Sequence, residues 1–270
     1  MAAVRETREE TGLTAHLGIP LPDATYTVMS RTGTPDEKRV RYWAATVTGS
    51  AARLAHEVDE VAWLGVDEAH HRLDYARDRE QLLAVTQSHE HGVLGTWPLI
   101  VVRHAKAVAR ADYEGADDQR RPLDERGRAR ARALIPVLAA YGIRRLVSSP
   151  SVRCADTLAP YAAAARLRVR PKEGLSEEGF ATRPEAASRQ VARLLERGNP
   201  AAICSHGPVL PGILTTLATR VTPDLIGRDE VVALLEEAAA DKMVKGEALV
   251  CHVVGTGAQA GIVAAERHLP

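Results

Sequence analysis

Short, dense apolar runs recur along the second half of the chain, and two of them pass directly into histidine-bearing polar segments. Residues 99–102 are all apolar and three of them are β-branched, which predicts a fully buried strand. The run ends in Arg-His-Ala-Lys at residues 103–106, although cations are among the last groups that a core accepts. Residues 201–204 repeat the design and lead into Ser-His-Gly. Because ligands of open α/β sheets bind beyond the carboxyl ends of the strands, these two tips predict an anion site.

Strand and helix patterns alternate through the rest of this half. The expected strands cover residues 99–102, 145–148, 167–169, 201–204, 249–254 and 262–266. One expected helix opens at residues 123–127, with Asp124 as an N-cap, and ends at Gly142; a second starts at residues 149–153. Further helices are expected over residues 184–197, 208–219 and 229–240. A loop that carries acidic residues is expected over residues 174–180. This alternation predicts a parallel or mixed α/β sheet.

The first half has a different pattern. Residues 1–11 predict a short helix that Gly12 ends, and strands are expected over residues 14–21, 24–30, 38–48 and 57–64. An amphipathic helix is expected over residues 67–85. The pattern then lapses into Gln, Ser, His and Gly, which indicates a linker. The expected domains are therefore residues 1–85 and 99–270, joined by a linker at 86–98.

Composition narrows the class of protein. The chain has 270 residues, is 45% hydrophobic and contains no apolar run near the ~18 residues of a membrane span. Its formal net charge of zero argues against a partner such as duplex nucleic acid or a membrane surface. The three cysteines lack the spacing of a metal site, and no signal peptide is evident. We therefore expect a cytoplasmic protein. The sequence is compatible with a homodimer.

Four motifs at strand ends occur in a characteristic order. They are Arg-His at 103–104, Ser-Ser-Pro-x-x-Arg at 148–153, Leu-x-Glu at 175–177 and Ser-His-Gly at 205–207. Together they resemble the histidine phosphatase superfamily, and the Arg-His-Ala-Lys-Ala variant points to the branch that includes protein phosphohistidine phosphatases. The resemblance implies a three-layer α/β/α domain that needs no cofactor.

Phosphoryl-transfer chemistry accounts for these residue types. A neutral His104 can attack phosphorus and hold the phosphoryl group covalently. Arg103, Arg153 and a protonated His206 would neutralise the phosphoryl oxygens. The resemblance makes Glu177 the candidate proton donor to the leaving oxygen, with Glu178 as the alternative, and a positioned acid contributes ~10²–10⁴-fold.

Lys106 has two interpretations, a ligand of the substrate phosphate or a solvated side chain. The cysteines are expected to be core filler, including Cys154 beside Arg153.

Near the N-terminus, Glu6, Glu9 and Glu10 share one face of the expected helix. Like charges at this spacing destabilise a helix by ~0.2–0.5 kcal/mol per pair, and a divalent cation would remove the repulsion. The alternative is a solvated helix in which Arg5 pairs with Glu9.

The string Arg5-Glu6-x-x-Glu9-Glu10-x-Gly12-Leu13 resembles the second half of the Nudix box. The resemblance implies that Glu6, Glu9 and Glu10 hold Mg²⁺ against a nucleoside polyphosphate. By the spacing of that box, its leading glycine and first glutamate would lie before Met1. We therefore expect a partial Nudix α+β domain with weak activity of its own.

Both halves together resemble a two-domain MutT-type family, associated with hydrolysis of 8-oxoguanine nucleoside triphosphates and diadenosine polyphosphates. That resemblance predicts an enzyme of the nucleotide pool, with a nucleoside polyphosphate or another phosphoester as substrate. A second hypothesis is a phosphatase of phosphohistidine proteins or small phosphoesters, with the Nudix remnant as a passenger. In a third, the remnant is a binding or dimerisation module.

Overall fold

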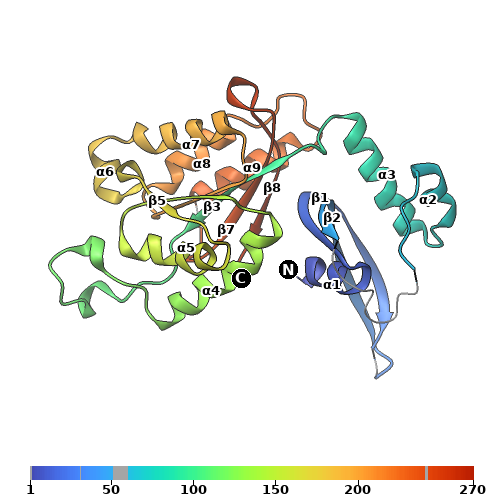
Figure 1. Ribbon diagram of the computed structural model, residues 1–270, viewed down its shortest axis with the longest axis horizontal. Coiled ribbons are helices and arrows are strands. Elements are labelled where there is room, and N and C mark those ends of the chain that lie inside the picture. Colours follow the sequence, from blue (N-terminus) through green and yellow to red (C-terminus); the bar gives the residue numbers. More distant parts are fainter. Residues whose placement is uncertain (1, 31, 51–59, 241–242) are drawn as a thin grey trace. The chain divides into compact units, whose positions relative to one another are not determined.

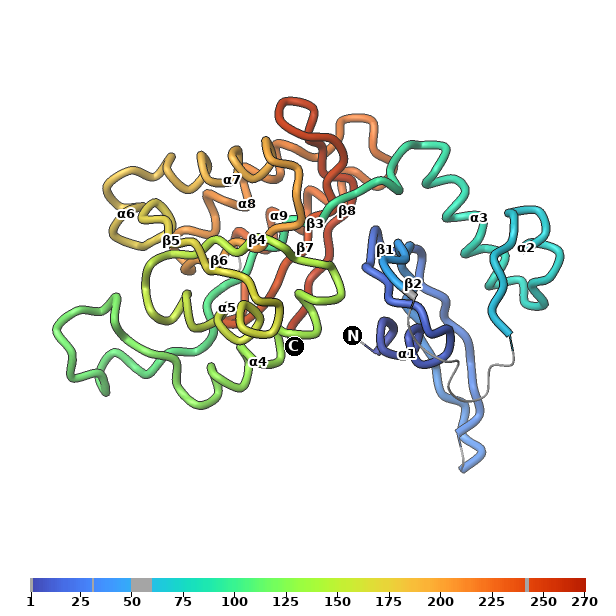
Figure 2. Tube along the Cα trace, viewed as in Figure 1, coloured from blue at the N-terminus to red at the C-terminus, as the bar shows by residue number. Residues whose placement is uncertain are grey.

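The computed structural model describes residues 2–30, 32–50, 60–240 and 243–270. It divides into two compact units, residues 2–95 and residues 96–270, whose chain paths can be followed in Figure 2. No helix in the described part of the chain has the length and apolar character that crossing a membrane requires.

The larger unit is built on a six-stranded sheet with the order β5-β4-β6-β3-β7-β8. β3, β4, β5 and β6 run parallel to one another, whereas β7 pairs antiparallel with both β3 and β8. The strands are β3 (Trp97–Arg103), β4 (Arg145–Ser148), β5 (Val169–Pro171), β6 (Ala201–Ser205), β7 (Ala248–Val254) and β8 (Gly261–His268). The mixed α/β sheet expected from the sequence is confirmed.

Helices cover both faces of this sheet (Figure 1). They are α4 (Glu125–Ala140), α5 (Val152–Ala164), α6 (Glu177–Thr182), α7 (Glu185–Arg197), α8 (Leu210–Ala218) and α9 (Arg228–Ala240). Alternate residues of β3, such as Leu99 and Val101, pack in a buried cluster with α7, α8 and α9. α4 and α5 pack together, and α5 contacts β4 and β6. Asp124 caps α4 as expected, accepting a hydrogen bond from the Gly127 amide at 2.6 Å.

The register of the parallel strands brings their carboxyl ends together. Arg103 at the end of β3 lies opposite Ser205 at the end of β6. Ser148 at the end of β4 lies opposite Cys204. The residues that follow these strands therefore meet at one edge of the sheet, where the sequence predicts the anion site.

The smaller unit is built on an antiparallel pair of strands, and its elements differ in part from the expected ones. It contains α1 (Ala2–Thr11), β1 (Leu13–Met29), β2 (Pro35–Ser50), α2 (Val66–Arg72) and α3 (Ala76–Glu90). Gly12 follows α1 with a positive φ of 70°, as its place at the helix end predicts. The two strands expected over 14–21 and 24–30 are one strand, whose register shifts across the intervening residues accommodate the break in pattern.

Two further expectations for this unit are wrong where the chain is described. Residues 60–64 form no strand, while 57–59 lie outside the described residues. The single helix expected over 67–85 is split, because Leu73 adopts an extended conformation and its carbonyl accepts from the Arg79 side chain at 2.6 Å.

The irregular connection is shorter than residues 86–98. α3 continues to Glu90, and β3 begins at Trp97. Trp97 is buried, and its indole N–H donates to the Gly255 carbonyl at 2.9 Å, which fixes the start of the strand.

Candidate active site

His104, directly after β3, is held in one tautomer by its own loop. The residue is 6% exposed, and Nδ1 lies 2.7 Å from the Ala105 carbonyl oxygen. Because a carbonyl only accepts, Nδ1 carries the proton and Nε2 keeps its lone pair. Burial, reinforced by nearby cations, lowers the pKa of His104 to about 3. The imidazole is therefore neutral at physiological pH, as a nucleophile must be.

Two arginines bring positive charge to this strand end. Arg153, on the first turn of α5, is 1% exposed and donates to the Asp118 carbonyl at 2.7 Å and to Glu177 at 3.1 Å. Arg103 donates to the Met243 carbonyl at 2.5 Å. The Nε–H groups of both arginines are buried and have no hydrogen-bond partner within the described residues. An unsatisfied buried donor costs ~1–3 kcal/mol, so an oxyanion that accepts from these groups would be stabilised.

Gly207 leaves the space that the Arg103 guanidinium occupies. A Cβ at position 207 would lie 3.0 Å from Nη2 of Arg103. Glycine is therefore needed at position 207 for a steric reason, because the Arg103 cation approaches the backbone closely there.

His206 is buried and engaged at both ring nitrogens. Nδ1 lies 3.2 Å from Glu177 Oε1, and Nε2 lies 2.8 Å from the Ser149 hydroxyl oxygen. Burial acts to lower the pKa of His206, but hydrogen bonds with Cys154 and Glu177 outweigh it and raise the pKa to about 9. The ring is 5.2 Å from that of His104, centroid to centroid. A neutral and a protonated histidine thus lie side by side at the strand ends.

The ionisation of Glu177 differs from the one that its predicted role needs. The hydrogen bond with His206 is the main cause that lowers its pKa to about 2, and Arg153 adds to the effect. Its carboxylate is therefore charged in the free protein and cannot deliver a proton in that state. Glu178, the alternative donor, is exposed. Glu177 instead keeps His206 protonated and holds Arg153 in place.

Asp118 is a site residue that the sequence analysis missed. Its carboxylate lies 3.2 Å from Nη1 of Arg153 and 2.8 Å from Nε of Arg121, and it also pairs with Arg110. The hydrogen bond with Arg121 is the main cause that lowers the pKa of Asp118 to about 2. Asp118 lies in a long polar loop rather than at a strand end, so only the folded loop shows that it positions Arg153.

Cys154 is fully buried in the core, as expected from the sequence, and it also contacts His206. Its Sγ lies 3.4 Å from Nε2 of His206. Burial acts to raise the pKa of this thiol, but hydrogen bonds with Cys204 and His206 lower it below the ordinary value. The thiol therefore contributes to the charge state of the adjacent histidine.

Lys106 does not join this cluster. Its Nζ lies 3.1 Å from Asp124, the N-cap of α4, and its side chain is 52% exposed. The lysine thus forms an exposed ion pair with the N-cap residue of α4.

The glutamates of α1 are not arranged as a formed metal site. Arg5 pairs with Glu9 at 3.1 Å and with Glu6 at 3.4 Å. Within the described residues, no group of three or more His, Cys, Asp or Glu side chains is disposed to hold a metal ion. Glu6, Glu9 and Glu10 still offer an oxygen-only donor set of the kind that Mg²⁺ prefers. Binding would require Arg5 to release its partners.

The pKa values of the two histidines predict the pH dependence of the site. His206 is protonated below pH about 9, so its positive charge is present at neutral pH and is lost as the pH rises through that value. His104 becomes cationic only near pH 3. After correction for ionisation of the substrate, we expect kcat/KM for p-nitrophenyl phosphate to stay level from pH about 5 to 8. A fall below pH 7 would contradict this assignment of charges.

Phosphoryl transfer through a histidine requires a neutral imidazole as the nucleophile and cationic side chains to neutralise the phosphoryl oxygens. This site has both. These features define a hydrolase of phosphate esters or anhydrides.

Comparison with known proteins agrees with this class. Residues 99–182 match the family model of the histidine phosphatase superfamily (branch 1), and residues 1–85 match that of the NUDIX domain. The 8-oxo-(d)GTP phosphatase of Mycolicibacterium smegmatis is 39% identical over 230 residues, which are 84% of this chain and 68% of that protein. The chain belongs to the family that joins a NUDIX domain to a histidine phosphatase domain.

Two solved structures match about two thirds of this chain at low sequence identity. The SixA protein of Nakamurella multipartitia is 21% identical with a TM-score of 0.47, covering 64% of this chain and 96% of that one. The mycobacterial glucosyl-3-phosphoglycerate phosphatase Rv2419c is 16% identical with a TM-score of 0.44, covering 64% and 98%.

Proposed function

We propose that this chain hydrolyses oxidised guanine nucleotides of the 8-oxo-(d)GTP class, with a phosphohistidine on His104 as the intermediate. The observation that carries the proposal is the free Nε2 of a neutral His104 beside His206, the buried Arg153 and the half-buried Arg103. The activity named for the Mycolicibacterium smegmatis relative supports the nucleotide. Such a substrate places the enzyme in the nucleotide pool, and hence in the cytoplasm.

The reaction follows from these side chains in two steps. Nε2 of His104 forms a bond to the terminal phosphorus while the bond to the leaving oxygen breaks and that oxygen takes the electron pair. Arg103, Arg153 and His206 neutralise the remaining phosphoryl oxygens. Water then attacks the phosphohistidine, its proton passes to the Glu177 carboxylate, and the N–P bond breaks to release phosphate and the free imidazole.

The N-terminal unit would contribute through magnesium. Glu6, Glu9 and Glu10 would hold the ion, which when bound neutralises charge on a polyphosphate chain. A glutamate helix of this kind has no evident use in a phosphatase of phosphohistidine proteins. The nucleotide therefore has more support than the second hypothesis, in which the N-terminal unit is a passenger.

The test is an assay of the full chain with 8-oxo-dGTP and magnesium. We expect release of phosphate and a phosphorylated enzyme intermediate that is labile in acid and stable in base. Hydrolysis of p-nitrophenyl phosphate without any turnover of 8-oxo-dGTP would overturn the proposed substrate and support the phosphatase of small phosphoesters.

Chelation of divalent cations should distinguish the activities of the two units. Hydrolysis of p-nitrophenyl phosphate needs only the histidines and arginines of the larger unit, so EDTA should leave its rate unchanged. Activity that depends on the glutamates of α1 should be lost on the same treatment and restored by Mg²⁺. A large loss of p-nitrophenyl phosphate hydrolysis with EDTA would contradict the division.

A further inference from the structure

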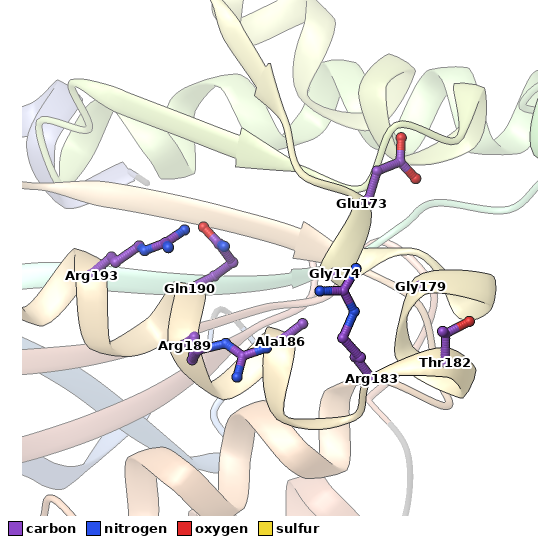
Figure 3. A pocket seen from close by; sticks show the side chains of 9 residues that line it. All are labelled: Glu173, Gly174, Gly179, Thr182, Arg183, Ala186, Arg189, Gln190 and Arg193. Carbon is purple, nitrogen blue, oxygen red and sulfur yellow. The ribbon is translucent and has the colours of Figure 1, made fainter.

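The larger unit has a cavity whose lining includes none of the residues of the His104 cluster. It is a cavity of about 330 Å³ between α7 and the segment that runs from Glu173 through α6. Figure 3 shows Arg183 reaching into it from the end of α6, while Arg189, Gln190 and Arg193 come from α7. Ligand cavities in proteins have volumes of roughly 300–1,000 Å³, so this one has room for a small ligand.

The base of the cavity is formed by close backbone packing. A Cβ at Gly174 would lie 2.6 Å from the Cβ of Ala186, and a Cβ at Gly179 would lie 2.0 Å from the Glu173 carbonyl oxygen. A larger residue at Gly174 would push the segment away from α7, and one at Gly179 would push α6 away from Glu173 within the segment. The small residues therefore keep the segments close together beneath the arginines.

The charge around the cavity is strongly unbalanced. Arg189 and Arg193 are one helical turn apart, a spacing at which like charges destabilise a helix by ~0.2–0.5 kcal/mol. Arg189 pairs with Glu185 at 3.0 Å, but Arg183 and Arg193 have no ion pair within the described part of the chain. The carboxylate of Glu173 points away from the guanidinium groups in Figure 3. Three arginines therefore line one cavity, and only one of them has an ion pair within the described residues, in a chain whose formal net charge is zero.

We infer that this cavity binds a polyphosphate chain, either free or carried by a nucleotide. Guanidinium groups donate paired hydrogen bonds that match phosphate oxygens, and three of them suit a ligand with several phosphates better than a monoanion. The Gln190 amide adds an uncharged donor. The inference does not depend on the proposed function, because none of the residues that line this cavity belongs to the His104 cluster.

The experiment titrates inorganic triphosphate into the full chain by calorimetry, with EDTA present so that α1 cannot bind it through a metal. Hydrogen–deuterium exchange on the same complex locates the site. We expect saturable binding with protection of residues 182–193, which contain no residue of the His104 cluster, including in the His104→Ala variant. Arg183→Gln or Arg193→Gln should weaken binding about fivefold, and the exposed position of these arginines should make it weaken further with added salt.

The matched control is Arg132→Gln, which removes an exposed arginine from α4 and should leave the affinity unchanged. Titration with GTP distinguishes the sources of the ligand. Equal affinities identify the phosphate chain alone, and tighter binding of GTP identifies a nucleotide. Three results would overturn the inference. They are a failure of triphosphate to bind, protection from exchange only in the segments around His104 and Arg153, and an Arg132→Gln variant that weakens binding as much as Arg183→Gln or Arg193→Gln does.

Discussion

Replacing His104 by alanine should lower kcat for p-nitrophenyl phosphate at least about 10³-fold, since removal of a catalytic nucleophile can cost about 10⁶-fold. Nε2 of His104 is the atom that we expect to bond to phosphorus, and no other imidazole of this cluster has a free lone pair. His206 is protonated and donates from both nitrogens. The variant should remain folded, because His104 follows the end of β3 outside the apolar cluster of Leu99 and Val101, and its hydrogen bond to a neighbouring carbonyl is worth about 1 kcal/mol.

Trapping with ³²P-labelled substrate checks this prediction directly. The wild-type chain should carry an acid-labile, base-stable label on the peptide that contains His104, and the alanine variant should carry none. His89→Ala is the matched control, because it removes an exposed histidine of α3 and should leave both label and rate unchanged. A label that maps to another residue would show that His104 is not the nucleophile.

Much of the larger unit could be predicted from the sequence, because the positions of its strands and of the residues that follow them are visible in the apolar pattern. A dense apolar run fixes where a strand lies, and the parallel register then aligns the residue after β3 with the residue after β6. His104 and His206 were therefore placed together by sequence pattern alone. Their rings are 5.2 Å apart in the structure.

The parts that could not be predicted depend on loop conformation and burial. Asp118 contacts Arg153 only because a polar loop with two short helical turns carries it there. The charge of Glu177 depends on two buried cations, which a motif position does not reveal. In the smaller unit, the break between α2 and α3 depends on Arg79 reaching back to the Leu73 carbonyl.

The ionised Glu177 also predicts which leaving groups the enzyme accepts. A leaving phosphate, whose second pKa is about 6, departs as an anion without taking a proton. An alkoxide, comparable in basicity to hydroxide from water of pKa about 15.7, needs a proton as it leaves. Its nearest carboxyl group is charged and the proton of His206 is held by Glu177, so the described part of the site has no neutral carboxyl group to donate a proton, and a missing acid costs ~10²–10⁴-fold. We therefore expect kcat/KM for β-glycerophosphate to be lower by that factor than for a phosphoanhydride or for p-nitrophenyl phosphate.

Glu177→Gln distinguishes this account from one in which Glu177 is the general acid. If the carboxylate only holds His206 and Arg153 before the first step, the substitution should lower kcat/KM for aryl and alkyl phosphates by the same factor. It should also lower the pKa of the alkaline limb, because His206 loses the anion that keeps it protonated. A loss confined to alkyl phosphates would show that Glu177 donates the proton after all. An equal fall in kcat/KM for aryl and alkyl phosphates, together with a lower pKa for the alkaline limb of the pH profile, fits a site suited to phosphoanhydrides. Nucleoside polyphosphates are substrates of this kind.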